Sequence, residues 1–263
     1  MYIPKFEPHK HRMLYGFGPL KPNTKLSWWP WGKQPDSKEA FDEHMKDSKK
    51  RAILAAAGFD KTPIEYRANE QGFRMDMSLY DVPAGGSVYI GCSHTFGVGL
   101  NVEDTWAWKM AKARGEVPIN LSQPGGGFES QYRLLKSWID IIKPSRVYSL
   151  GSYQGRREFV SGFGGGAIRR NTTHQDLGEM GFIGFEEAET FLSDLRCIDA
   201  MRATCIENSA ELYLPSCTIG PHLQFAAWQN RSEVGYARDL SHFSPKWHTL
   251  IAERPESWWI KST

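Results

Sequence analysis

The sequence lacks the features that mark several large classes of protein. Its net charge is only +2 at pH 7, and lysine and arginine are spread along the chain, so we expect no nucleic-acid partner. It contains no apolar run of about 18 residues, the length needed to cross a bilayer, and no signal-peptide pattern. We therefore expect no membrane association and a chain that is cytoplasmic when made.

Cysteine and metal-ligand patterns are equally sparse. The four cysteines, Cys92, Cys197, Cys205 and Cys217, show no C-x-x-C spacing, which favours free thiols over a disulfide framework. His9 and His11 are separated by one residue in a polar tail, and no other histidine pair has the spacing of metal ligands. We therefore predict no metal site.

What the chain does have is a regular alternation of strand and helix signals, beginning near residue 87. Short apolar runs predict strands at 87–90, 117–121, 146–150 and 210–215. Amphipathic or helix-favouring stretches predict helices at 103–114, 129–142 and 186–208, and a final helix near Trp247. Repeated β-α-β units imply a three-layer α/β/α fold, in which helices cover both faces of a central parallel sheet.

Two segments interrupt this alternation. A glycine-rich stretch, 151–184, is irregular and is a candidate lid or cleft wall. Residues 1–65 form an aromatic-rich extension with no strand alternation, in which 36–57 predicts one charged helix. Its tryptophans, Trp28 to Trp31, either cover an apolar groove on the main domain, 66–263, or form a surface for a sugar or a protein partner.

The turn after the first strand of the alternating region carries the most informative residues. Gly91, Ser93, Gly97 and Gly99 place a hydroxyl in a tight glycine-spaced turn at the end of a buried strand. Ligand sites of open α/β sheets lie at that edge, where a serine is placed for nucleophilic attack. The alternative is an ordinary strand-to-helix connection with serine as a helix cap.

A second polar group lies just before the final helix. Asp239 precedes His242 by three residues, so its carboxylate can reach the imidazole Nδ1 and leave Nε2 free to accept a proton. A purely local interpretation is also open: Ser244 caps the helix, Pro245 occupies its first turn, and Asp239 closes a turn.

Taken together, these segments resemble the SGNH (GDSL-like) hydrolases. Gly91 to Gly99 is similar to the first motif of that family, and Asp239 with His242 is similar to its last. Between them, 120–127 resembles the second motif, and 69–74 resembles an Asn-x-x-Gly-Phe-Arg lead-in. The resemblance runs from about Tyr66 to Glu253 and implies a flavodoxin-like SGNH hydrolase fold.

The resemblance also implies a role for each matching residue. Ser93 is the expected nucleophile, His242 the general base and then acid, and Asp239 its orienting partner. The N–H groups of Ser93 and Gly125 are the expected oxyanion donors, and no cofactor is implied.

The chain departs from the family at two positions. Cys92 replaces the usual aspartate beside the nucleophile, and we do not expect it to attack instead, because adjacent side chains on a sharp turn point in different directions. The asparagine of the family's third motif is missing, and the corresponding segment offers Ser152 or Gln154 as a donor.

The resemblance implies a serine esterase that removes an acyl group, such as acetyl, from a carbohydrate or another small ester. The missing asparagine and the aromatic extension leave a second interpretation open, in which the chain is a weak or inactive SGNH-fold binding or structural module. Such chains also occur in tailed phages, which makes virion association a further expectation.

Overall fold

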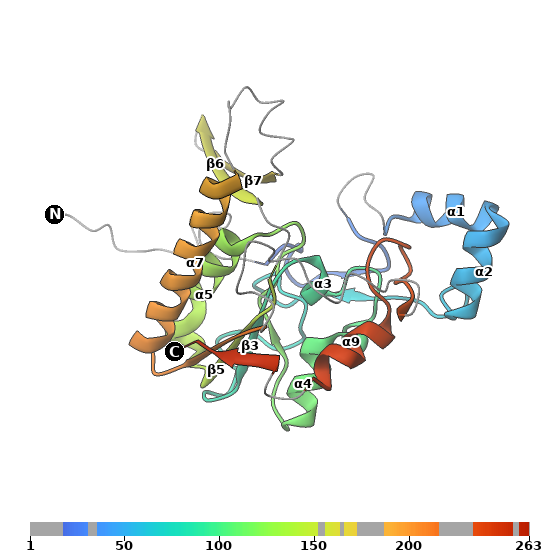
Figure 1. Ribbon diagram of the computed structural model, residues 1–263. Coiled ribbons are helices and arrows are strands. Elements are labelled where there is room, and N and C mark those ends of the chain that lie inside the picture. The colour runs from blue at the N-terminus through green and yellow to red at the C-terminus, as the bar shows by residue number, and fades with distance from the viewer. Residues whose placement is uncertain are drawn as a thin grey trace.

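A five-stranded sheet forms the centre of the molecule (Figure 1). The computed structural model describes residues 18–30, 36–151, 156–163, 166–172, 187–215, 234–254 and 258–262. In spatial order the strands are β4 (Ile119–Asn120), β3 (Ser87–Ile90), β5 (Arg146–Ser149), β8 (Glu211–Pro215) and β9 (Trp259–Lys261). The first four are parallel, and β9 pairs antiparallel with β8 at the sheet edge.

Helices cover both faces of this sheet. On one face lie α5 (Phe128–Ile142) and α7 (Glu187–Glu207), and on the other lie α4 (Trp106–Ala113) and α9 (Pro245–Ala252) (Figure 1). Side chains alternate along β3 as a strand requires: Val88 and Ile90 join the α5–α7 core, whereas Tyr89 joins the α4–α9 core. The predicted three-layer α/β architecture is confirmed.

Two strand regions were not predicted. No strand is expected after the final helix, yet β9 forms there and pairs antiparallel with β8. Its Trp259 stacks on Trp106 with ring centroids 5.4 Å apart, so β9 packs into the core between the sheet and α4. The glycine-rich stretch contains a hairpin of β6 (Arg157–Phe163) and β7 (Gly166–Thr172).

Two predicted helices are each divided by a capping residue. The first is 103–114, which consists of a 3-10 turn, η1 (Val102–Asp104), and then α4, whose N-cap Thr105 accepts a hydrogen bond from the N–H of Trp108. The second is 36–57, which is split at Asp47 into α1 (Lys38–Lys46) and α2 (Ser48–Ala56). The Asp47 carboxylate accepts from the first N–H groups of α2, so a side chain that caps helices outweighs the helical tendency of its neighbours.

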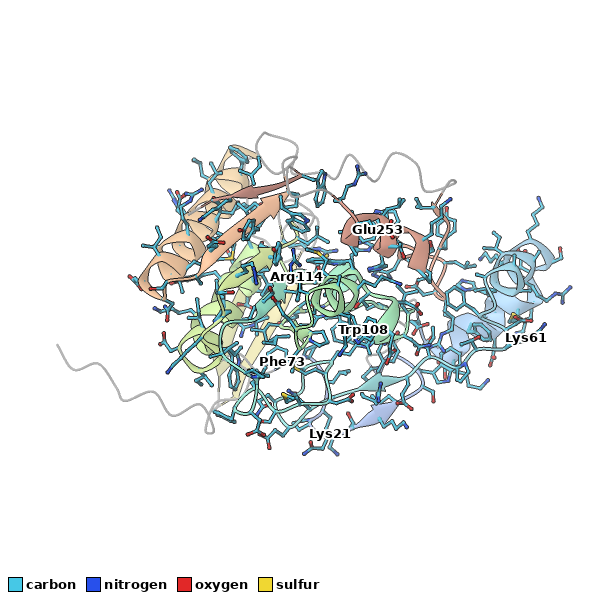
Figure 2. All side chains as sticks on the ribbon, turned by 90° about the horizontal axis from the view of Figure 1, so that it is seen from below. Lys21, Lys61, Phe73, Trp108, Arg114 and Glu253 are labelled. Atoms are coloured by element: carbon cyan, nitrogen blue, oxygen red, sulfur yellow. The ribbon has the colours of Figure 1, made fainter. Side chains whose placement is uncertain are left out.

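The N-terminal extension lies beside the segment that leads into α9 (Figures 1 and 2). It is tied to the main domain by a short antiparallel pair, β1 (Lys25–Leu26) with β2 (Tyr66–Arg67). Trp29 is buried against the rings of Tyr66 and Phe96, with centroids 5.9 and 5.2 Å away. Trp28 is half-buried, and Trp31 lies outside the described residues.

The strand order defines where a ligand site would lie. If the five strands are numbered in chain order, their spatial order is 2-1-3-4-5. The second strand, β4, lies on one side of β3, and the third, β5, lies on the other. In sheets of this kind, ligands bind outside the carboxyl ends of the strands at such a reversal. The turn that follows β3 therefore lies at the expected position.

Candidate active site

The turn after β3 presents Ser93 at the start of a one-turn helix, α3 (Ser93–Phe96). A Cβ atom on Gly91 would lie 2.1 Å from Thr95 Oγ1 and 3.1 Å from the Leu150 carbonyl oxygen, so only glycine fits there. Ser93 is 7% exposed. Within the described residues, neither its hydroxyl nor its N–H has a hydrogen-bond partner. Both groups are thus available to a ligand.

A buried arginine binds the backbone carbonyl groups that follow Ser93 in this turn. Arg74 donates to the carbonyl oxygens of Phe96, Gly97 and Leu100, and also to that of Glu65. Its guanidinium carbon lies 4.4 Å from the centroid of the Tyr66 ring. Burial lowers the pKa of Arg74 to about 10, which still leaves it charged at neutral pH.

The segment around Arg74 folds as a compact side-chain-bonded turn. The side-chain Oδ1 of Asn69 accepts from the N–H groups of Gln71 and Phe73, and its Nδ2 donates to the Met77 carbonyl oxygen. Gly72 adopts a φ of 83°, and a Cβ there would meet the Leu20 carbonyl oxygen at 2.4 Å. The Asn-x-x-Gly-Phe-Arg pattern thus serves to deliver Arg74 to the serine turn.

The loop after β4 brings Gly125 to the same edge of the sheet. Asn120, the last residue of β4, donates to the Thr95 carbonyl oxygen at 2.8 Å and accepts from Ser122, which links this loop to α3. Gly125 has a φ of 76° and, among the described residues, no acceptor for its N–H. A second free backbone donor therefore follows a neighbouring strand.

Asp239 and His242 form a closed polar unit before α9. The Asp239 Oδ2 atom bonds to the Nδ1 atom of His242, and Oδ1 accepts from the N–H groups of Ser241 and His242 at 3.0 and 2.9 Å. Burial alone would raise the pKa of the Asp239 carboxyl, but the hydrogen bonds from His242 and Ser241 outweigh it and lower that pKa. Asp239 is therefore an anionic acceptor, and Nε2 of His242 is the ring nitrogen left for other chemistry.

The local alternative for this loop holds only in part. Ser244 occupies the N-cap position of α9, but its hydroxyl donates to the Val234 carbonyl and accepts nothing from the helix. Pro245 does open the helix. Asp239 closes a turn and bonds to the imidazole at once, so the two interpretations of that residue are compatible.

Two contacts bring the serine turn and the histidine loop together. The N–H of Arg238 donates to the Gly99 carbonyl oxygen at 3.0 Å, and the ring centroids of His94 and His242 are 4.9 Å apart. No hydrogen bond joins Ser93 to His242 in the described residues. Such bonds are often long without a bound substrate and tighten only when one is present.

Two of the predicted oxyanion donors, Ser152 and Gln154, lie outside the described residues.

Within the parts of the chain that are described, no group of three His, Cys, Asp or Glu side chains could hold a metal ion. No helix in those parts is long and apolar enough to cross a membrane.

Sequence reasoning missed four residues that shape this site: Asp36, Asn120, Arg238 and His94. Asn120 and Arg238 stand inside or beside the motifs already singled out, so adjacency was an available signal. Asp36 gave none, because its partner lies 202 positions further along the chain.

Comparison with known proteins gives structural similarity only. No protein-family model and no curated protein sequence matches the chain. A lipolytic protein of the G-D-S-L family from Desulfitobacterium hafniense DCB-2 is similar over 64% of this chain and 95% of its own, at 14% identity and a TM-score of 0.40. TesA is similar over 64% and 94%, at 14% and 0.38. The psychrotrophic esterase EstA from Pseudoalteromonas sp. is similar over 64% and 93%, at 16% and 0.39.

Proposed function

We propose that this chain is an SGNH-type serine hydrolase of carboxylic esters. The observation that carries the proposal is the pairing of Asp239 with His242 Nδ1, on a loop that is bonded to the end of the Ser93 turn. The Ser93 turn follows β3, the strand at which the strand order reverses, and ligands of open α/β sheets bind at such a reversal.

The proposed reaction has two half-cycles, and in each of them His242 accepts a proton and then returns it. Ser93 Oγ attacks the ester carbonyl carbon while His242 Nε2 takes the hydroxyl proton. His242 then gives that proton to the departing alcohol, which leaves an acyl-serine. A water molecule attacks the acyl group, with His242 again accepting and returning the proton, and the acid is released. Asp239 holds the ring tautomer and offsets the positive charge of the imidazolium.

The oxyanion of the tetrahedral intermediate needs donors that are already in place. We propose the N–H groups of Ser93 and Gly125, which have no protein acceptor among the described residues. Gln154 or Ser152 would supply the third donor in place of the family's asparagine. Replacing a true donor by alanine should lower kcat by roughly 10²-fold and leave KM nearly unchanged, because the bond forms only in the transition state. Wild-type rates from both variants would remove these residues from the site.

The limited exposure of the site favours a short acyl group. The side chain of His242 is 15% exposed, and Ser93 is nearly buried. We propose an acetyl or similarly small acyl group carried by a carbohydrate or another small alcohol. Rates with aryl acetate, butyrate and octanoate should fall with chain length, and a preference for octanoate would contradict this assignment.

The direct test combines turnover with covalent labelling. The purified chain should hydrolyse an aryl acetate, and an alkyl fluorophosphonate should add one phosphonyl group at Ser93. The Ser93→Ala variant should lose both properties and keep its melting temperature. A folded wild-type chain that neither turns over nor becomes labelled would instead be the non-catalytic binding or structural module.

A further inference from the structure

We propose that Asp36, in the N-terminal extension, is a positioning residue that holds the serine turn and the histidine loop in register. This inference rests on the proposed function for its catalytic consequence, but its structural content is independent of it. The extension is then part of the working site and not an appendage to it.

The first link runs from Asp36 to the histidine loop. Arg238, the residue before Asp239, donates from Nε and Nη2 to the two carboxylate oxygens of Asp36, each at 2.8 Å. Both side chains are almost completely buried. A guanidinium held by two parallel bonds has a fixed direction as well as a fixed distance, so the backbone that leads into Asp239 is held in one place.

The second link runs from Asp36 to the serine turn. The Tyr66 hydroxyl donates to Asp36 Oδ2, and the Tyr66 hydroxyl oxygen accepts from the N–H of Gly99 at 2.7 Å. The Gly99 carbonyl in turn accepts from the N–H of Arg238 at 3.0 Å. Asp36, Tyr66, Gly99 and Arg238 therefore form a closed ring of contacts across four segments of the chain.

The extension also fixes Asp36 itself. Its carbonyl oxygen accepts from the N–H of Trp29, and Arg238 donates to the Ser27 carbonyl at 2.8 Å. The guanidinium carbon of Arg238 lies 3.9 Å from the centroid of the Trp28 ring. The half-buried Trp28 thus covers a cation, and this contact argues against Trp28 as an open sugar platform.

Stability alone does not account for this arrangement. Buried ion pairs cost much desolvation energy, and apolar side chains of similar volume are often as stabilising. What the ion pair adds is a fixed orientation of Arg238, and with it of the backbone that leads into Asp239. A second arginine, Arg74, packs against this ring of contacts: its guanidinium faces Tyr66 and also bonds the Gly97 carbonyl oxygen of the serine turn. Because both arginines carry positive charge, Asp36 is the anion that lets them lie together.

The test removes the ion pair without leaving a buried charge. In the double variant Asp36→Leu/Arg238→Met, apolar side chains replace both partners, so we expect the fold to persist. If Asp36 positions the site, kcat for an aryl acetate falls roughly 10²-fold with KM nearly unchanged, because small displacements of catalytic groups cost that much. A double variant that is folded and has the kcat of the wild type would show that the ion pair is purely structural, and would overturn the proposal.

A spectroscopic readout separates this proposal from the proposed function. The proton shared by His242 Nδ1 and Asp239 should give a low-field NMR resonance in the wild type. We expect that resonance to be lost or broadened in the double variant and in Asp36→Asn. An unchanged resonance in a folded variant would refute the positioning role. If the wild-type chain has no esterase activity, the resonance still decides whether Asp36 holds the loop.

Asp47→Ala provides the matched control. It also removes a carboxylate from the extension, where Asp47 caps α2, but Asp47 does not bond to Arg238 or Tyr66. It should leave both kcat and the resonance unchanged. Equal losses in the control and in Asp36→Asn would mean that any weakening of the extension has this effect, and the specific role of Asp36 would fall.

Discussion

The serine turn and the histidine loop reach the same edge of the sheet by different means. The serine turn is built from nearby chain: glycines that permit close approach, and Arg74 and Asn120 that bond its carbonyl groups. The histidine loop is closed internally by Asp239, but its position depends on Asp36 from the opposite end of the sequence. Local motifs therefore shape each loop, whereas a long-range ion pair relates them.

This difference predicts that substitutions in the two loops will have different effects on stability and activity. Substitutions at the glycines of the serine turn should displace its backbone, since a Cβ added at Gly91 or Gly97 would lie 2.1 Å from Thr95 Oγ1 or 2.3 Å from Thr105 Cγ2. Substitutions around the histidine loop should change the position of His242 or the charge of a nearby group. Their effects should therefore depend on pH or on the residue that pairs with the one replaced.

The largest effect is expected from removing the reacting groups. Ser93→Ala and His242→Ala should each lower kcat by about 10⁴-fold or more, and the double variant should be no slower than either one. The reason is that each substitution removes the same path through the transition state. Steady-state rates with an aryl acetate check this, and additive losses would mean that the two side chains do not act as a unit.

A backbone clash should come next. In Gly91→Ala the new methyl group would lie 2.1 Å from Thr95 Oγ1 and 2.8 Å from its Cβ atom. We expect the free energy of unfolding to fall by about 1–3 kcal/mol, with loss of most activity as the Ser93 turn shifts. Gly86→Ala is the control, because nothing lies within 4 Å of its added Cβ. Equal melting temperatures for the two variants would show that the turn is more adaptable than its contacts suggest.

Acid should lower the free energy of unfolding through the buried His248. This residue of α9 accepts the N–H of Trp106 at 3.1 Å, and burial lowers its pKa to about 3. The folded protein therefore keeps His248 neutral, whereas the unfolded chain protonates it below its ordinary pKa of about 6.5. Because the unfolded state binds more protons, stability is complete above pH ~6.5 and declines as pH falls toward 3, by up to about 1.4 kcal/mol per pH unit.

Denaturant titrations at a series of pH values measure this slope. His248→Gln keeps a hydrogen-bond acceptor and does not titrate, so its stability should depend less on pH in the same range. Identical slopes for the two proteins would assign the acid sensitivity to other groups.

The smallest effect is expected far from the contact between the two loops. Asp47→Ala should lower the free energy of unfolding by about 1 kcal/mol, the usual cost of a lost N-cap, and leave kcat unchanged. Thermal melts and aryl ester rates check both parts. A fall in kcat as large as that of Asp36→Asn would contradict the specific role of Asp36.

Much of the central domain was predictable because its signals are local. The strand 87–90 has the predicted bounds, and α5 and α7 begin and end within a residue of theirs. The three-layer arrangement follows from β-α-β repetition, and the spacing of Asp239 and His242 was enough to predict their contact. These features depend on periodicity, on turn geometry and on residues that are close in sequence.

The features that were not predicted depend on distant partners or on competition between local preferences. Asp47 divides one expected helix because its carboxylate caps the second half. The strand β9 was not predicted, because its three residues carry no periodic signal and it forms by pairing with β8. Asp36 resembles any other acidic residue before a helix until Arg238 is placed beside it.

By itself, the sequence determined the α/β class, the glycine-spaced turn of Ser93 and the local pairing of Asp239 with His242. It could do so because each depends on residues within about one turn or one strand of each other. Only the tertiary structure decided that Arg74 bonds the serine turn and that Asp36 lies between that turn and the histidine loop. The physical reason is that a buried charge needs a partner in space, and that partner is chosen by the packing of the whole chain.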